Sequence, residues 1–331
     1  MNTELPDLDL EAIRATARAN AADLLETPVA PLHGATVHRL LGDADVWMKL
    51  ELFQRTGSFK ARGALTAVRR LTPEQRARGI TAVSAGNHAV AAAFAAQQAG
   101  VSARIVVLAS ANPARMALAR SYGAELLVAP DGATGFAMVE ALVRDEQRTF
   151  IHPFEGESPS LGTATVGLEF ANQVKDMDVV LVAVGGGGLA SGVSTAIRKL
   201  QPNCRVIGVE PEGNDVMQRS FAAGSPQRQE KSSTIADSLA PPMTTPMAYG
   251  LCRRHMERIV TVSDDEICRA MAVLFRDAKL AVEPAGAAAL AALLGPLREE
   301  LQGKRVGVIV CGANIDADTF SQQLARGERL L

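Results

Sequence analysis

The stretch VVLVAVGGGGLASG, residues 179–192, decides the fold class of this 331-residue chain. An aliphatic, β-branched run typical of a buried strand leads directly into four consecutive glycines and then into residues that favour a helix. Four glycines carry a large conformational-entropy cost, and a turn needs only one or two. We therefore predict that the backbone of residues 185–188 closely approaches a phosphate group, with its N–H groups and the dipole of the following helix directed at that phosphate.

The same alternation of strand-like and helix-like segments extends over the rest of the chain. Short β-branched runs predict strands, and Ala-rich or amphipathic stretches of helical length separate them. This alternation indicates an α/β fold with mainly parallel sheets and helices on both faces, in which ligands bind at the carboxyl ends of the strands. The predicted strands are 46–50, 79–83, 103–108, 125–128, 178–184, 205–209, 258–262 and 305–310, and the predicted helices are 88–99, 114–122, 136–146 and 264–279.

Local signals mark two helix starts and two loops. Asn112 before a proline predicts an N-cap, and Ser263 with Glu266 predicts a capping box. The polar stretch 224–233 is a predicted loop. The proline-rich stretch 241–246 is a second one, because neither a helix nor a central strand tolerates that density of prolines.

Composition restricts the class of protein. Lys and Arg number 34 against 36 Asp and Glu, and aromatic residues are 4%, so the basic excess and the stacking residues of a nucleic-acid binder are missing. The N-terminal stretch has no apolar leader region, and no apolar run has membrane length. The four cysteines form no C-x-x-C pair, and the five histidines show no zinc spacing. We expect a cytoplasmic protein without a membrane or nucleic-acid partner.

Lys60 is a candidate nucleophile. It lies in QRTGSFKARGA, residues 54–64, where a turn with Gly and Ser runs into helix-forming residues. Phe59 and small neighbours would partly exclude water from the amine, which lowers its pKa and frees it to react. The alternative interpretation is a solvated surface lysine, since most lysines are exposed.

Two further candidate segments follow predicted strands. SAGNH, residues 84–88, would present backbone N–H groups at a helix N-terminus to a carboxylate, or it is an ordinary capped turn. Cys311, in VIVCGANID, residues 308–316, is either a buried small hydrophobic residue or a weak neutral donor to a ligand.

The glycine-rich segment admits two cofactors. Gly185, Gly187 and Ala190 fit G-x-G-x-x-A, and the next predicted strand is followed by Glu210, so a dinucleotide with its ribose on that acid is one interpretation. The chain would then be an NAD-dependent oxidoreductase, although no acid or base for hydride transfer is evident. The other interpretation is a monophosphate cofactor with Lys60 bonded to it covalently.

Taken together, these segments resemble the fold-type II pyridoxal-phosphate enzymes, and within them the serine/threonine dehydratases and serine racemases. The similarity extends from about residue 25 to residue 318. It rests on the order GSFKARGA (57–64), SAGNH (84–88), HPFEGE (152–157), GTATVGLE (162–169), the four glycines, VEP (209–211) and CGANID (311–316). It implies a two-domain α/β fold similar to the tryptophan synthase β-subunit. The large domain would be 1–66 with 156–331, and the small domain, 67–155, would close over the substrate.

The resemblance also implies a role for each matching residue toward pyridoxal 5'-phosphate. Lys60 would form the Schiff base with the aldehyde, and Phe59 would pack beside the ring. Asn87 would hydrogen-bond the ring hydroxyl, and Cys311 would face the pyridine nitrogen, where this group carries Ser or Cys. The phosphate would bind the backbone of Gly185, Gly186, Gly187, Gly188 and Leu189. The substrate carboxylate would bind Ser84, Ala85, Gly86, Asn87 and His88.

The implied activity is that of a dehydratase, or ammonia-lyase, acting as a homodimer. A 3-hydroxy amino acid of the serine/threonine type would become a 2-oxo acid and ammonia, with Lys60 removing the Cα proton. An amino-acid racemase of the same fold is the alternative. Racemases place a serine on the opposite face, where this chain has Ala85, so efficient racemisation is not expected.

The resemblance also bears on metal binding and on the choice of substrate. Some relatives bind a divalent cation near Glu210 and Asp215, but Val216 replaces the second carboxylate, so no metal site is expected. Serine, threonine, 3-hydroxyaspartate and bulkier substrates all fit the same core. Four residues are candidate contacts for a second carboxylate on the substrate, with a structural or solvated role as the alternative for each: His88, His152, Arg115 and Arg120. Residues 238–245 are predicted to lie near the mouth of the cleft.

Overall fold

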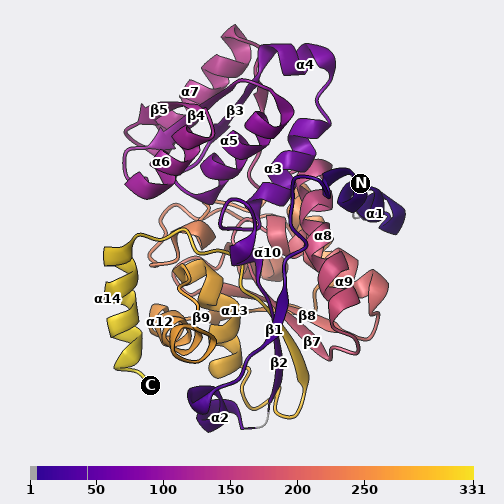
Figure 1. Cartoon of the computed structure of the whole chain (residues 1–331), viewed down its shortest axis with the longest axis vertical. Coiled ribbons are helices and arrows are strands. Elements are labelled where there is room, and N and C mark those ends of the chain that lie inside the picture. Colours follow the sequence, from indigo (N-terminus) through magenta and orange to yellow (C-terminus); the bar gives the residue numbers. More distant parts are fainter. Residues whose placement is uncertain (1–5, 43) are drawn as a thin grey trace.

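The computed structural model describes residues 6–42 and 44–331, which form two sheets with helices packed around them (Figure 1). Residues 1–5 of the predicted large domain lie outside the described residues. The strand orders are β1-β2-β10-β7-β8-β9 and β5-β4-β3-β6, and every neighbouring pair is parallel except β1 with β2. The strands are β1 (Val29–Pro31), β2 (Asp45–Lys49), β3 (Ile80–Val83), β4 (Ala103–Leu108), β5 (Glu125–Ala129), β6 (Thr149–Phe150), β7 (Val179–Ala183), β8 (Arg205–Pro211), β9 (Arg258–Val262) and β10 (Arg305–Ile309). The predicted α/β class with mainly parallel sheets is confirmed.

Helices cover both faces of each sheet. Because crossovers between parallel strands are right-handed, the direction in which the chain moves along a sheet fixes the face that each helix covers. α5 and α6 therefore lie on one face of the small sheet and α7 on the other, while α9 and α11 lie opposite α12 and α13 on the large sheet (Figure 1). The helices are α1 (Leu10–Asn20), α2 (Ala35–Leu41), α3 (Lys60–Arg69), α4 (Pro73–Arg78), α5 (Asn87–Ala99), α6 (Pro113–Ser121), α7 (Gly132–Asp145), α8 (Glu157–Gln173), α9 (Gly188–Leu200), α10 (Val216–Ala223), α11 (Pro246–His255), α12 (Asp264–Val273), α13 (Pro284–Leu294) and α14 (Ala317–Glu328).

The local signals are confirmed at the helix starts. Asn112 caps α6 by accepting from the backbone N–H of Ala114, and Ser263 forms a capping box with Glu266 at the start of α12. The predicted loops 224–233 and 241–246 are irregular up to the start of α11, and a single bridge pairs Arg228 with Met243.

Two predicted helices differ at their ends. α7 begins at Gly132 rather than at residue 136, because the Asp131 side chain accepts from the N–H of Thr134 and starts the helix earlier. The predicted helix 264–279 is α-helical only to Val273 and continues as a π-helical turn, η3 (Leu274–Ala278).

The core of the large sheet consists of apolar elements buried on all sides. All five residues of β7 are buried, as expected of a parallel strand with helices on both faces. α13 is likewise buried along its whole length, so its apolar sequence serves packing. Among the described residues, no helix is both long and apolar enough to cross a membrane.

In the small sheet, β3 ends immediately before residues 84–88. In the large sheet, β7 ends two residues before the first of the four glycines, and β10 ends two residues before Cys311. The fold thus places the candidate segments at the carboxyl ends of strands from both sheets. We call residues 80–150 with their sheet the small-sheet region, and the six-stranded sheet with its helices the large-sheet region.

Candidate active site

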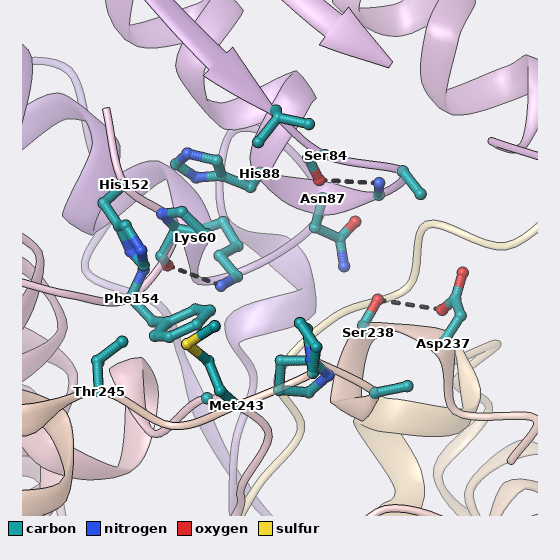
Figure 2. Close-up of a pocket in the computed structure, with 18 of the residues that line it drawn as sticks. Lys60, Ser84, Asn87, His88, His152, Phe154, Asp237, Ser238, Met243 and Thr245 are labelled. Carbon is teal, nitrogen blue, oxygen red and sulfur yellow. Dashed lines mark hydrogen bonds between the residues drawn. The ribbon is translucent and has the colours of Figure 1, made fainter. Parts of the chain in front are cut away.

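Lys60 begins α3 and lines a cavity, rather than extending from the exposed surface. Its Nζ donates a hydrogen bond of 2.9 Å to the carbonyl oxygen of Pro153 (Figure 2) and lies 5.1 Å from the ring centre of Phe59. Burial lowers the pKa of Lys60 to about 8, although the Cys311 and Glu283 side chains act in the opposite direction. A larger fraction of this amine is therefore neutral near pH 7 than of an ordinary lysine.

A buried ion-pair cluster fixes the helix turn that carries Lys60. Arg62 is 2% exposed, and its Nε donates to Glu51 at 2.8 Å while its Nη1 donates to Glu169 at 2.6 Å. Lys49 joins the cluster through Glu169 at 2.6 Å. The opposing charges raise the pKa of the Arg62 guanidinium against the effect of burial and keep it charged. The cluster ties α3 to α8 and β2 just beyond Lys60.

Residues 84–88 form the turn between β3 and α5. The Ser84 hydroxyl accepts from the backbone N–H of Gly86 at 2.9 Å (Figure 2). Asn87 is buried, its Nδ2 donates to Glu283 at 2.7 Å, and its Oδ1 accepts from Asn314 at 2.7 Å. The amide orientation of Asn87 is therefore fixed from two sides, and one N–H of its Nδ2 is left for another acceptor.

His88 and His152 are neutral parts of the same wall. His88 Nε2 donates to the carbonyl oxygen of Ile151 at 2.8 Å, and burial lowers the pKa of His88 to about 3. His152 Nδ1 accepts from the backbone N–H of Glu155 at 2.9 Å, and burial lowers its pKa to about 4. Neither imidazole carries charge near neutral pH, so Lys60 has no second cation beside it from these residues.

The four glycines form a close-packed turn between β7 and α9. Gly187 has φ +97°, a left-handed conformation that favours glycine. A Cβ added to Gly186 or Gly188 would lie 2.7 Å or 2.6 Å from Phe154, and one added to Gly187 would lie 2.6 Å from Met217 Cε. The turn accordingly has no room for side chains. Its backbone, continuing into Leu189 at the start of α9, lines a small cavity of about 30 Å³ that Lys60 and Asn87 also line and that we call the inner cavity.

Cys311 lies at the far end of β10 and faces the same inner cavity as Lys60, Asn87 and the glycines. It is 3% exposed, and its Sγ donates to the carbonyl oxygen of Ala285 at 3.3 Å. Burial, reinforced by the carboxyl group of Glu283, raises the pKa of the thiol far above its usual range. The group is therefore a neutral thiol, as expected if Cys311 is a weak neutral donor to a ligand.

The larger cavity that Lys60 lines has a volume of about 320 Å³. Residues 84–88 line one side, and residues 237–245 line another (Figure 2). Phe136, Phe154 and Met243 make much of this cavity apolar. Met243 belongs to residues 238–245, which were expected near the mouth of the cleft and do contribute to the lining, whereas no site role was predicted for Phe136 or Phe154. The proline density of 241–246 predicted a loop, but its place depends on tertiary contacts, since the Gln229 N–H donates to Pro242 O at 2.8 Å.

The acidic residue of the dinucleotide pattern is engaged elsewhere. Glu210 is buried and accepts from the backbone N–H groups of Met217 and Gln218 at 2.8 Å and 2.7 Å, which closes the first turn of α10. Burial raises its pKa to about 8. Among the described residues, no group of three or more His, Cys, Asp or Glu could hold a metal ion.

Comparison with known proteins agrees with this geometry. The family model described as pyridoxal-phosphate dependent enzyme matches residues 23–312. Phenylserine dehydratase of Ralstonia pickettii is 50% identical over 325 residues, 98% of each chain. L-threonine ammonia-lyase of Thermotoga maritima is 37% identical over 86% of this chain and 70% of its own. The solved structure of maize serine racemase has a TM-score of 0.89 at 30% identity, covering 97% of this chain and 99% of that one.

The chain belongs to the pyridoxal-phosphate-dependent enzymes, with the fold-type II architecture that the resemblance predicted. More particularly, it is a dehydratase, a carbon–nitrogen lyase with pyridoxal 5'-phosphate as its cofactor. The interpretation as an NAD-dependent oxidoreductase is wrong, because the G-x-G-x-x-A pattern belongs to this family's glycine turn and Glu210 caps α10.

The residues present fit the cofactor. The side-chain-free glycine turn precedes a helix N-terminus suited to a phosphate, and Lys60 Nζ lines the same inner cavity. The Thr245 hydroxyl is buried beside this region and has no hydrogen-bond partner among the described residues. An orphaned buried hydroxyl is costly unless a ligand or water satisfies it, and a phosphate oxygen would do so.

Proposed function

We propose that the substrate of this dehydratase is a 3-hydroxy amino acid whose β-carbon carries an aryl ring. The observation that carries the proposal is the apolar lining of the larger cavity by Phe136, Phe154 and residues 241–243. Burying an aromatic ring there contributes about 25 cal/mol for each Å² of apolar area removed from water, with further gain from ring–ring contact. Phenylserine dehydratase, half identical to this chain, bears such a substrate in its name.

Charge argues against a second carboxylate on the substrate. Lys60 is the only Lys or Arg among the described residues that line the larger cavity. Arg115, a candidate for this contact, instead donates to Asp237 and Glu283 and does not line the cavity. A β-carboxylate would lie near the exposed Asp237 without a cation to pair with, which disfavours 3-hydroxyaspartate. Threonine fits but leaves most of the apolar lining in contact with water.

In this proposal, the cofactor is held by Lys60 at its aldehyde, by the backbone of the four glycines and Leu189 at its phosphate, and by Phe59 beside its ring. Asn87 donates its remaining amide N–H to the ring hydroxyl, and Cys311 faces the ring nitrogen. When bound, the cofactor withdraws electrons from the substrate's Cα and makes its proton acidic. The substrate carboxylate is held at the N-terminus of α5 by the polar turn, which consists of Ser84, Ala85, Gly86, Asn87 and His88.

Lys60 then acts as the general base. Its lowered pKa leaves a larger fraction of the amine neutral near pH 7 than in an ordinary lysine, and its Nζ accepts the Cα proton. The β-hydroxyl leaves with one proton as water, and hydrolysis of the released enamine then consumes one water to give the 2-oxo acid and ammonia. The neutral Cys311 thiol offers the ring nitrogen no anion, which favours loss of the hydroxyl over return of the proton.

Racemisation lacks its second acid–base group. Ala85 lines the cavity at the position where the resemblance requires a serine, and a methyl group carries no proton. Ser84 lies next to it, but its hydroxyl accepts from the Gly86 N–H within the turn. We propose that racemase activity is at most a minor side reaction.

The remaining organisation is proposed from the resemblance. The large domain is 1–66 with 156–331, and the small domain is 67–155, with α3 crossing between them. The enzyme is a cytoplasmic homodimer without nucleic-acid or membrane partners. Sedimentation equilibrium of the purified protein tests the dimer, and a monomer at micromolar concentration would contradict it.

The decisive experiment combines a spectrum with a substrate screen. A visible band at about 410 nm that borohydride removes, with the label found on Lys60, is expected of a lysine-bound cofactor. threo-Phenylserine should give a kcat/KM at least roughly 10-fold above that of threonine or serine, measured as 2-oxo acid release. Preference for threonine or for 3-hydroxyaspartate would overturn the aryl assignment, and a label absent from Lys60 would overturn its role.

A further inference from the structure

Arg115 is a buried arginine at the junction of the two sheet regions. It lies in α6 of the small-sheet region and is 6% exposed. All of its donor groups point across the junction. Its Nε donates to Asn314 O at 2.7 Å, its Nη1 to Asp237 at 2.6 Å and its Nη2 to Glu283 at 3.3 Å. The proposed reaction assigns no role to any of these contacts.

Glu283 connects this arginine to the site. It is 1% exposed and lies at the N-terminus of α13, in the large-sheet region. One carboxylate oxygen accepts from Arg115 and the other from the Nδ2 of Asn87. The Asn87 amide could in principle present either its oxygen or its nitrogen to the cavity. An acceptor at Glu283 and a donor at Asn314 together select the orientation that leaves an N–H available.

We propose that Arg115 is a positioning residue that holds the small-sheet region against Asp237 and Glu283 and thereby sets the orientation of Asn87 toward the cofactor. The inference rests on the proposed role of Asn87. Gly86 supports the placement, because a Cβ there would lie 3.2 Å from Arg115 Nη1. The guanidinium thus packs closely against the turn that carries Asn87, so a shift of Arg115 would also shift that turn.

The charges explain why an arginine is needed. Burial raises the pKa of Glu283 to about 7, Arg115 opposes that shift, and Asp237 adds to it. The other groups that face this carboxyl are Asn87, the backbone of Asn314, and, through their charges, Lys60 and Cys311. The Arg115 charge favours the ionised carboxylate, which accepts at both oxygens. A protonated carboxyl would compete as a donor and release Asn87.

The test compares Arg115→Ala with Arg120→Ala, an exposed arginine on the same helix. In the holoenzyme, hydrogen–deuterium exchange of residues 84–89 and 236–240 should be faster in R115A than in R120A. R115A should also bind pyridoxal 5'-phosphate roughly 10-fold more weakly and lose roughly 10-fold or more in kcat, because a buried charged hydrogen bond is lost. Exchange and affinity equal to those of R120A would overturn the proposal.

A double variant separates positioning from stability. Arg115→Ala alone leaves Glu283 buried without its cation and is expected to lower the melting temperature. Arg115→Ala with Glu283→Gln removes both charges and should recover stability while the cofactor affinity and kcat remain low. Recovery of all three would show a purely structural role and contradict the inference. Failure of the proposed function itself would appear differently, as borohydride label absent from Lys60 in the unmodified enzyme.

Discussion

The two sides of the active-site cavity are built in opposite ways. On the cofactor side, Lys60, Asn87 and Cys311 are each held by a named hydrogen bond, and the glycine turn is packed so closely that no side chain fits. On the other side, Phe136 is 48% exposed, and residues 241–243 belong to an irregular loop. In the proposed function, the chemistry therefore depends on fixed polar geometry, and the choice of substrate depends on the apolar lining.

Among substitutions on the two sides of the cavity, the largest loss of activity is expected at Lys60. Lys60→Ala removes the general base and the covalent anchor, and we expect kcat to fall by roughly 10³-fold or more. Stability should change little, because the variant also removes a partly desolvated amine. Turnover is measured as 2-oxo acid release, and substantial activity in this variant would refute the assignment of the base.

The two neutral histidines of the site, His88 and His152, should lower the free energy of unfolding in acid. His88 and His152 are neutral when folded, with pKa values lowered to about 3 and about 4, so the stability they contribute is present above about pH 6.5 and is lost as pH falls toward those values. Each should contribute up to about 1.4 kcal/mol of loss per pH unit in that window. Urea unfolding between pH 7 and pH 4.5 measures the slope, and His88→Gln should make it shallower; an unchanged slope would contradict this account.

The glycine turn provides a matched pair of variants. Gly187→Ala forces a Cβ to within 2.6 Å of Met217 at a left-handed φ, so cofactor affinity should fall by roughly 10- to 100-fold. Gly224→Ala introduces the same kind of backbone strain at φ +70° where nothing lies within 4 Å. Cofactor titration should separate the two, and equal losses of affinity would mean that the turn is not the phosphate site.

Substitutions on the apolar side should change the preference between substrates without changing the cofactor chemistry. Phe136→Ala or Met243→Ala should reduce the preference for phenylserine over threonine by roughly 10-fold through lost apolar contact. The visible spectrum should stay as in the unmodified enzyme. Phe275→Ala is the control, since Phe275 is 42% exposed and does not line the cavity. An unchanged ratio of kcat/KM values in the two cavity variants would remove this wall from substrate recognition.

The smallest effect is expected at Cys311. Cys311→Ser replaces one neutral donor by another at the same place, so kcat should stay within roughly 3-fold of the unmodified value. The pH dependence of the visible band should also be preserved. A loss as large as that of Lys60→Ala would show that the thiol acts in a way that its neutral, buried state does not explain.

Features that depend on a few neighbouring residues were predicted correctly, and features with a weak or displaced local signal were missed. Strands such as 103–108, the capping box at Ser263 and the glycine turn follow from signals within a few residues, and they are confirmed. The start of α7 was missed because the cap at Asp131 lies outside the apolar pattern that suggested the helix. Strand β1 was missed because three residues that include a proline give too weak a signal.

By itself, the sequence determined the α/β class and the glycine turn, because each depends on residues that are neighbours along the chain. Only the tertiary structure decided which distant segments meet. Phe136 and Met243 lie 107 positions apart in the sequence and line one cavity, and Arg115 reaches Asp237 and Glu283 across the junction of the two sheets. Such contacts depend on how two sheets pack, and no local pattern of residues encodes that packing.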